Sequence, residues 1–238
     1  MKTANKRKGY SVESLRKLMR LWKFWKAFYM AIGAAFLNVA ITKGNIKIGR
    51  VLNVSLMPIV TCANCKVCHG YCYDIKACLQ YLNVLKARVR NTVIYMFDPA
   101  RYFDQIENAI RKARKNFYFR WHVSGDIPDY HYLCEMVRIA RENTNWTFWT
   151  YTKNYKLVNK WIADNGGTKA ALPSNLSIMF SEWDGLEMDN PYGLPTFGVI
   201  EPGSPVPAGK FLCPGNCDIC KAMNGGCIAG VDTVNYLH

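Results

Sequence analysis

The segment Phe117-Tyr-Phe-Arg-Trp-His-Val-Ser-Gly-Asp126 decides the fold of this chain. Residues 117–124 are rich in aromatic and apolar side chains and predict a buried strand. A Gly-Asp-Ile-Pro turn follows, and residues 130–143 then carry apolar side chains at helical spacing. The same order recurs downstream, with strands expected at 146–152, 176–181, 196–201 and 231–237 and a helix at 155–164. Because strands that alternate with helices form parallel sheets through right-handed crossovers, the pattern predicts an α/β fold, as a (β/α) barrel, a partial barrel or an open doubly wound sheet.

Upstream of this segment the sequence predicts elements of the same kind. Strands are expected at 46–48 and 51–61, and helices at 74–90 and 98–115, the second starting at Asp98-Pro99 with proline in its first turn. A basic arm and an amphipathic helix, with Ser11 as its N-cap, precede them. We therefore expect two parts, residues 1–45 as the basic arm and helix and residues 46–238 as the α/β domain.

Eight of the ten cysteines lie in two groups of four. The first cysteine group is Cys62, Cys65, Cys68 and Cys72, and the second is Cys213, Cys217, Cys220 and Cys227. The first has the C-x2-C-x2-C-x3-C spacing that bacterial ferredoxins use for iron–sulfur clusters. The second begins with the C-x3-C-x2-C spacing of radical S-adenosylmethionine enzymes, although it lies near the C-terminus, whereas those enzymes carry it after their first strand. Both groups therefore predict metal ligands.

Iron–sulfur clusters, one or two of the [4Fe–4S] type, suit this pattern better than zinc does. Each group brings four thiols within eleven or fifteen residues, whereas zinc usually takes C-x2-C pairs across a longer spacer. Zinc stays an alternative, and a pair of disulfide-stapled loops is another. Disulfide scaffolds are usually small secreted chains, so cysteines in this spacing favour a reducing, cytoplasmic location. The fourth ligand of each cluster, and whether an iron is left open, are not determined by spacing.

Polar residues follow the expected strands. They are Ser124, Gly125 and Asp126; Thr152 and Lys153; Ser181, Glu182 and Trp183; Glu201; and His238. Because the loops at the carboxyl ends of parallel strands converge, these residues predict a site at one edge of the sheet, with both cysteine groups attached to it. The candidate catalytic residues are Asp126, Lys153, Glu182 and His122, and the candidate cofactor-binding residues are Ser124, Gly125 and Ser181. Alternation along the strand predicts Arg120, His122 and Ser124 on one face.

The positive charge is concentrated at the N-terminus. The formal net charge is +14, and twelve of the 31 lysines and arginines lie in residues 1–50 beside a single acidic residue, Glu13. Such a segment suits the phosphates of DNA or RNA, an anionic membrane surface, or an acidic partner. The apolar run 28–41 contains Gly33 and Asn38 and is too short to cross a bilayer, so no transmembrane segment is expected.

The chain resembles the phage and mobile-element gene product 88 family. The matching segments are Leu56-Met-Pro58 to Thr61-Cys62, Cys72-Tyr73, residues 119–126, Thr152-Lys153, Ser181-Glu-Trp183, and Cys213 to Cys220 with Cys227. The resemblance spans roughly residues 46–238 and leaves the basic helix outside. More loosely, the Ser-Gly-Asp, Thr-Lys and Cys-Tyr segments are similar to a second phage family thought to be related to radical S-adenosylmethionine proteins.

Three functions follow as expectations. The first is an iron–sulfur enzyme that uses S-adenosylmethionine reductively on a nucleotide or nucleic acid. The second is a non-catalytic nucleic-acid-binding protein stabilised by zinc or clusters. The third is an electron-transfer module, for which the ferredoxin-like spacing is the only argument.

Overall fold

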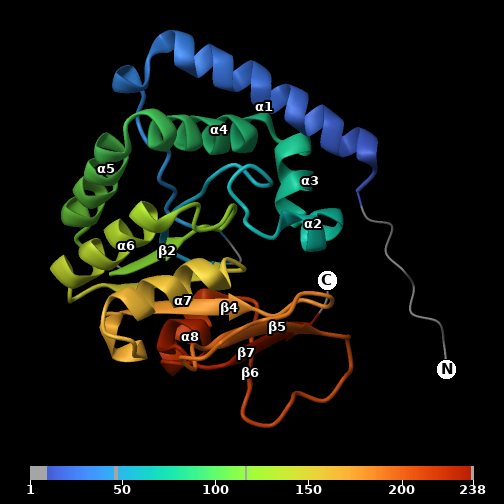
Figure 1. Cartoon of the computed structure of the whole chain (residues 1–238), viewed down its shortest axis with the longest axis vertical. Coiled ribbons are helices and arrows are strands. Elements are labelled where there is room, and N and C mark those ends of the chain that lie inside the picture. Colours follow the sequence, from blue (N-terminus) through green and yellow to red (C-terminus); the bar gives the residue numbers. More distant parts are fainter. Residues whose placement is uncertain (1–9, 46–47, 116, 237–238) are drawn as a thin grey trace.

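A seven-stranded, wholly parallel sheet organises the described part of the chain. The computed structural model describes residues 10–45, 48–115 and 117–236 (Figure 1). The strands are β1 (Leu52–Val54), β2 (Tyr118–Trp121), β3 (Thr147–Thr152), β4 (Leu176–Ser181), β5 (Thr196–Ile200), β6 (Phe211–Leu212) and β7 (Thr233–Tyr236). Their order in the sheet is β1-β2-β3-β4-β5-β7-β6. The first five strands therefore lie side by side in chain order, as they would in a barrel.

The sheet does not close into a barrel, which corrects the barrel-like form of the prediction. The edge strands β1 and β6 have only three and two residues, and within the described ranges each forms a ladder with one neighbour. A sheet built in chain order with right-handed crossovers places its connecting helices on one face. Its other face, which a closed barrel would turn inward, is covered here by the C-terminal segment α8 (Cys217–Met223) and η4 (Gly226–Ala229).

The main core lies between the sheet and the helices of the first face. These helices are α4 (Leu82–Phe97), α5 (Pro99–Lys112), α6 (Tyr130–Glu142) and α7 (Tyr155–Asp164). Phe119, Trp121, Phe148 and Phe180 from the sheet are fully buried against them. The opposite face holds Trp149 and Met179 in a second, smaller core. Alternate residues of each strand therefore belong to different cores, as the two-residue period of a strand requires.

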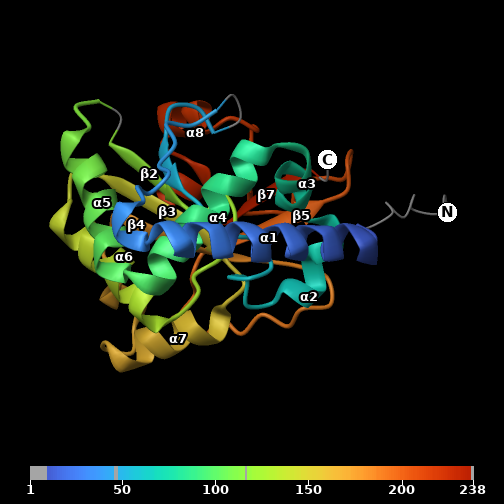
Figure 2. The ribbon, with the colours of Figure 1, turned by 90° about the horizontal axis from the view of Figure 1, so that it is seen from above.

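The longest helix, α1 (Val12–Ile32), lies on the outside of this assembly. It packs along α4 and contacts α3 (Tyr73–Gln80), with Leu18, Trp22 and Tyr29 buried in the contact (Figures 1 and 2). Ser11 caps it by accepting a hydrogen bond from the Ser14 amide. The helix is thus attached through one face only, and its other face points away from the molecule.

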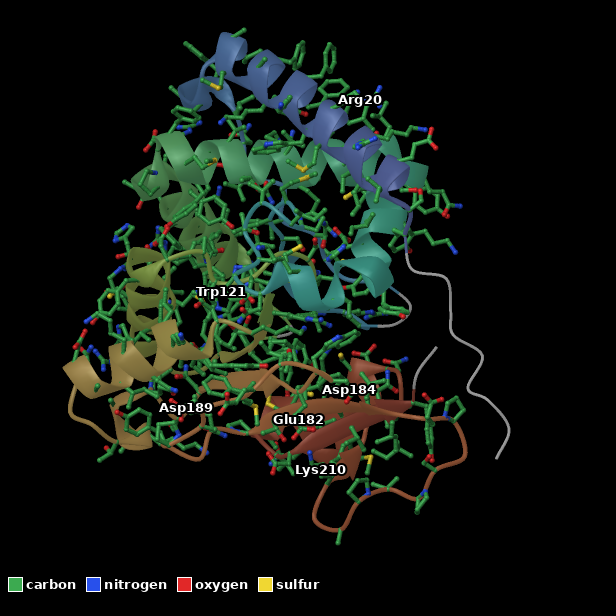
Figure 3. The ribbon with its side chains drawn as sticks, turned by 45° about the vertical axis from the view of Figure 1, so that its right-hand side comes forward. Arg20, Trp121, Glu182, Asp184, Asp189 and Lys210 are labelled. Carbon is green, nitrogen blue, oxygen red and sulfur yellow. The ribbon has the colours of Figure 1, made fainter. Side chains whose placement is uncertain are left out.

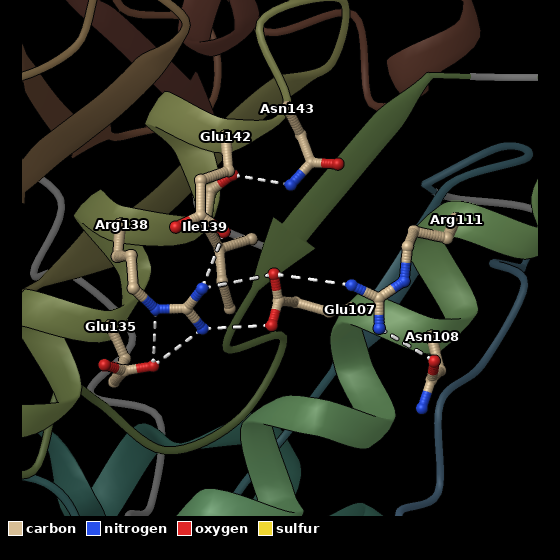
Figure 4. A network of polar contacts seen from close by, with 8 residues as sticks. All are labelled: Glu107, Asn108, Arg111, Glu135, Arg138, Ile139, Glu142 and Asn143. Atoms are coloured by element: carbon tan, nitrogen blue, oxygen red, sulfur yellow. Dashed lines mark hydrogen bonds and ion pairs between the residues drawn. The ribbon is translucent and has the colours of Figure 1, made fainter.

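An ion-pair network joins α5 to α6 (Figure 4). Glu107, which is buried, receives two hydrogen bonds of 3.0 and 3.2 Å from the Arg138 guanidinium. Arg138 also contacts Glu135 and the more exposed Glu142. Glu107 and Glu135 raise the pKa of Arg138 further above its usual value. The bidentate contact to a buried carboxylate fixes the angle between the two helices.

The element boundaries predicted from sequence were wrong at several places. The strand expected at 51–61 has only three residues, because the chain leaves the sheet at Ser55. The helix expected at 74–90 is two helices, α3 and α4, separated by the extended residue Tyr81. Two of the three residues of the strand expected at 46–48 lie outside the described residues, as does His238. No helix in the described ranges is long and apolar enough to cross a membrane.

Candidate functional site

The loops at the carboxyl edge of β1 to β3 meet around Asp126. Its Oδ1 accepts hydrogen bonds from the Thr152 hydroxyl (2.6 Å) and the Ile127 amide (2.7 Å), and its Oδ2 accepts one from the Lys153 amide (3.0 Å). The side chain is buried. Burial raises the pKa of this carboxyl group, and the three hydrogen bonds oppose the shift. Through these hydrogen bonds, Asp126 connects the loop after β2 to the end of β3, so its role in the site is structural.

Ser124 and Gly125 hold the loop after β1 against the loop after β2. Gly125 has a φ of +82°, and a Cβ there would lie 2.7 Å from Thr61 Oγ1 and 2.9 Å from Leu56 Cβ, so the position requires glycine. The buried Ser124 hydroxyl donates a hydrogen bond to the Leu56 carbonyl oxygen (3.1 Å) and contacts the Asp74 carboxylate. The first cysteine group follows directly after Thr61. These contacts therefore position that group.

His122 lies on the opposite side of the sheet from Arg120, which corrects the prediction that they share a face. Strand β2 ends at Trp121, and His122 takes a φ of +53°, which interrupts the alternation of side chains. Its buried ring lies 5.0 Å from the Tyr132 ring centre, and its Nδ1 is 3.2 Å from the Thr150 hydroxyl. In the described part of the chain, its buried Nε2 has no hydrogen-bond partner. His122 thus belongs to the main core beneath α6.

The burial of His122 predicts a specific dependence of stability on pH. Burial, with the charge of Arg120 adding, lowers the pKa of His122 from 6.5 to about 3. Between these values the unfolded chain binds a proton that the folded protein does not, so stability falls as the pH falls from 6.5 towards 3. The slope reaches about 1.4 kcal/mol per pH unit.

We expect His122→Gln to reduce the loss of unfolding free energy between pH 7 and pH 5, measured by urea denaturation. His131→Gln is the matched control, because His131 lies exposed on α6 and should leave the slope unchanged. Equal slopes in the wild type and both variants would contradict this account of His122.

Lys153 lies beside the first cysteine group. Its ammonium group is 5.3 Å from the centre of the Trp183 ring, and its carbonyl oxygen accepts a hydrogen bond from the Asn64 side chain, next to Cys65. Burial raises the pKa of the Cys65 thiol to about 11, other thiols of the group add to this, and the charge of Lys153 opposes it. Lys153 therefore lies at the same edge of the sheet as the first cysteine group.

Tyr155 is a rim residue that no sequence pattern predicted. Its hydroxyl donates a hydrogen bond to the Ser181 carbonyl oxygen, so Ser181 contributes its backbone here. Burial raises the pKa of Tyr155 to about 12, and the negative charges of Asp126, Glu182 and Cys68 add to the shift. The phenol thus lies among three of the predicted site residues. Its position at the start of a predicted helix gave no signal of this.

Glu182 is paired with a cation from a distant part of the chain. Its carboxylate lies 2.5 Å from the ammonium group of Lys210, which also contacts the Thr196 hydroxyl at 3.3 Å (Figure 3). Both side chains are partly exposed. Glu182 therefore carries a compensated charge at the β4 and β5 end of the rim.

The first cysteine group lies in the loop after β1, which includes α2 (Cys65–Cys68) and the short helix η2 (His69–Tyr71). Burial is the main cause that raises the pKa values of Cys62 and Cys72, and the neighbouring thiols of the group add to it. Asp126 raises the pKa of Cys62 further. The thiols of the first group therefore raise one another's pKa values, and Asp126 at the polar rim also raises that of Cys62.

The second cysteine group packs on the other face of the sheet rather than beside the first group. Cys220 and Cys227 are buried in the smaller core with Trp149 and Met179. Burial raises the pKa of Cys220 to about 12 and that of Cys227 to about 11, and Cys213 adds to both shifts.

Arg120 and Tyr151 accompany this second group. The Arg120 guanidinium lies 4.7 Å from the centre of the Tyr151 ring, and its charge opposes the raised pKa of Cys217 and Cys227. Its buried Nε has no hydrogen-bond partner among the described residues. The Tyr151 hydroxyl hydrogen-bonds to the Cys227 sulfur. The Arg120 cation and the Tyr151 hydroxyl therefore favour the deprotonated, negatively charged form of the nearby thiols.

All ten cysteines are free thiols, so the disulfide alternative is not seen. Among the described residues, no three His, Cys, Asp or Glu side chains are placed to hold one metal ion. The donor set nevertheless fits a soft metal, since each group offers four thiols within a short segment. Asp218, the one carboxylate between them, is paired with Lys221. Four thiolates of a [4Fe–4S] cluster bind different iron atoms, so they stand farther apart than the ligands of one zinc ion.

Comparison with known proteins adds a family. The family model described as gene product 88 matches residues 31–190. This range includes the first cysteine group and the rim from Asp126 to Glu182, and it excludes most of α1 and the whole second cysteine group. No curated protein and no solved structure matches the chain.

Proposed function

The chain belongs to the gene product 88 family, and from that premise we propose that it is an iron–sulfur protein that carries out reductive chemistry at the rim of its sheet. The observation that carries this proposal is the first cysteine group itself, four free thiols in ferredoxin-like spacing. They lie beside Lys153, Tyr155 and Asp126. The matched family range includes all of these residues.

Each residue has a separate role in the proposal. Cys62, Cys65, Cys68 and Cys72 would hold one [4Fe–4S] cluster and the second cysteine group another; such a cluster, when bound, supplies single electrons. Lys153 offers a cation to an anionic ligand, and Trp183 supplies an aromatic surface beside it. Asp126, Ser124 and Gly125 position the loops, since their polar groups are already used within the protein. Glu182 and Tyr155 lie at the same rim of the sheet.

The proposed substrate is a nucleotide or nucleic acid, and S-adenosylmethionine is the proposed co-substrate. The net charge of +14 supports a polyanionic substrate. Lys153 and Trp183 together suit a ligand with both a negative charge and a flat ring.

Metal analysis of anaerobically purified protein tests the proposal. We expect iron and acid-labile sulfide for two clusters per chain, and an electron paramagnetic resonance spectrum of the reduced protein that changes when S-adenosylmethionine is added. Iron without that change would remove the radical chemistry and favour electron transfer. Zinc without sulfide would overturn the proposal.

A non-catalytic nucleic-acid-binding protein is the second candidate, favoured by the concentration of cations in residues 1–50. Its cysteine groups would hold structural zinc or clusters. This candidate requires an affinity for DNA or RNA that falls steeply with salt, and no cleavage of S-adenosylmethionine by the reduced protein.

A further inference from the structure

Along the outward face of α1, charged residues come first and apolar residues follow. After a first turn that exposes Val12 and the single acid Glu13, its N-terminal half exposes Arg16, Lys17, Arg20 and Lys23. From Phe24 onward the outward residues are apolar, and the exposed ones are Phe24, Ala27, Phe28, Met30, Ala31, Ile32, Ala35 and Phe36. The last two lie just past the end of α1, in or beside η1 (Ala34–Phe36). One continuous surface therefore has a cationic half and an apolar half.

The apolar half is unusually exposed for such large side chains. Phe24 is 62 % exposed, Phe28 46 % and Phe36 82 %. Phe24 and Phe28 lie one turn apart, on the same side of the helix as Arg20. Edge-to-face contacts of 5.3 and 5.2 Å with Trp25 hold both rings in place. Exposed apolar surface of this kind marks an interaction site.

The cationic half is free to meet a partner. No ion pair in the described part of the chain involves Arg16, Lys17, Arg20 or Lys23. Arg20 lies on the outer edge of the molecule (Figure 3). Lys26, by contrast, is directed to the ring of Trp22 and that of Phe97 in α4, so it belongs to the packed side.

We propose that the outward face of α1 docks on an anionic lipid bilayer, with Phe24, Phe28, Ile32 and Phe36 entering the headgroup region and Arg16, Arg20 and Lys23 pairing with lipid phosphates. Helices of this composition lie in the plane of a membrane interface, and they need both apolar burial and attraction to anionic lipid. A second copy of the chain would bring its cations against these cations if the two helices ran parallel, and against the apolar half if they ran antiparallel. A nucleic acid would pair with the basic half and leave the aliphatic and aromatic half in water. The bilayer is the occupant that satisfies both halves.

Vesicle co-sedimentation of the full chain tests the docking, and it does not depend on the metal content. We expect binding to mixed phosphatidylcholine–phosphatidylglycerol vesicles and much weaker binding to phosphatidylcholine alone. The double variant Arg16→Gln/Arg20→Gln should bind the mixed vesicles about 30-fold more weakly. Phe24→Ser/Phe28→Ser should weaken binding at least about tenfold, because the rings no longer enter the interface.

Two controls keep this test specific. Lys112→Gln/Lys115→Gln removes two exposed cations at the far end of α5, and Phe117→Ser removes an exposed aromatic ring outside α1. Both should bind as the wild type does. Circular dichroism should show unchanged helix content in every variant.

Three outcomes would overturn the proposal. The first is equal binding by the α1 variants and the controls. The second is binding to DNA or RNA that the Arg16/Arg20 variant loses, with no vesicle binding. The third is a dimer that Phe24→Ser/Phe28→Ser converts to a monomer, with no vesicle binding.

Discussion

Replacing two cysteines of one group is expected to remove roughly half of the iron and sulfide from anaerobically purified protein. The first variant is Cys65→Ser/Cys68→Ser, in the loop after β1, and the second is Cys213→Ser/Cys217→Ser, after β6. Serine keeps the size of the side chain but replaces a soft thiolate with a hydroxyl that is not deprotonated near neutral pH. Because the two groups lie on different sides of the sheet, each variant should leave the other group loaded.

The matched control is Cys134→Ser, which should keep the full complement of metal. Cys134 lies in α6 outside both groups, where its sulfur accepts a hydrogen bond from the Trp161 indole at 3.3 Å. Iron, sulfide and zinc would be counted per chain in all three variants. Loss of all metal in either double variant would show a shared site, and full retention in both would exclude the cysteine groups as ligands.

Asp126→Ala is expected to lower the free energy of unfolding by about 4 kcal/mol, because it leaves three donors, two buried and one partly buried, without an acceptor. These donors are the Thr152 hydroxyl and the amides of Ile127 and Lys153. Asp126→Asn should cost less, since its amide oxygen can still accept from two of them. Urea denaturation measures both differences.

Asp184→Ala provides the control for Asp126. Asp184 is an exposed carboxylate in the loop after β4, so its removal should change stability by no more than about 0.5 kcal/mol (Figure 3). An Asp126→Ala variant as stable as the wild type but unable to change the spectrum on addition of S-adenosylmethionine would show that Asp126 acts on a ligand. That result would reverse the positioning role assigned to it here.

The order of elements could be predicted from the sequence because it depends on neighbouring residues. The helix starting at Asp98-Pro99 is confirmed, with the Asp98 side chain accepting a hydrogen bond from the Arg101 amide. The strands at 147–152 and 176–181 fall within one residue of their predicted bounds. Apolar periodicity, caps and turns are local signals, and tertiary packing does not override them at these positions. The parallel sheet followed from their alternation.

The contents of the site could be predicted only in part. Asp126 and Lys153 were predicted at the rim from their places after strands, and the structure brings both beside the first cysteine group. Tyr155 was missed, because a tyrosine at a helix start has no local mark of function. His122 was assigned to the wrong face, because the prediction continued the alternation of side chains past Trp121, where the strand ends and His122 takes a positive φ.

By itself, then, the sequence determined the parallel α/β alternation, the two groups of thiols and the concentration of cations near the N-terminus. The tertiary structure decided that the sheet stays open, that the second cysteine group faces Arg120 and Tyr151 across the smaller core, and that α1 leaves Phe24 and Phe28 exposed. The physical reason is the range of the interactions. Periodicity and spacing act over a few residues, whereas the electrostatic interaction of Arg120 with Cys217 and Cys227 joins segments about a hundred residues apart, and no local pattern records it.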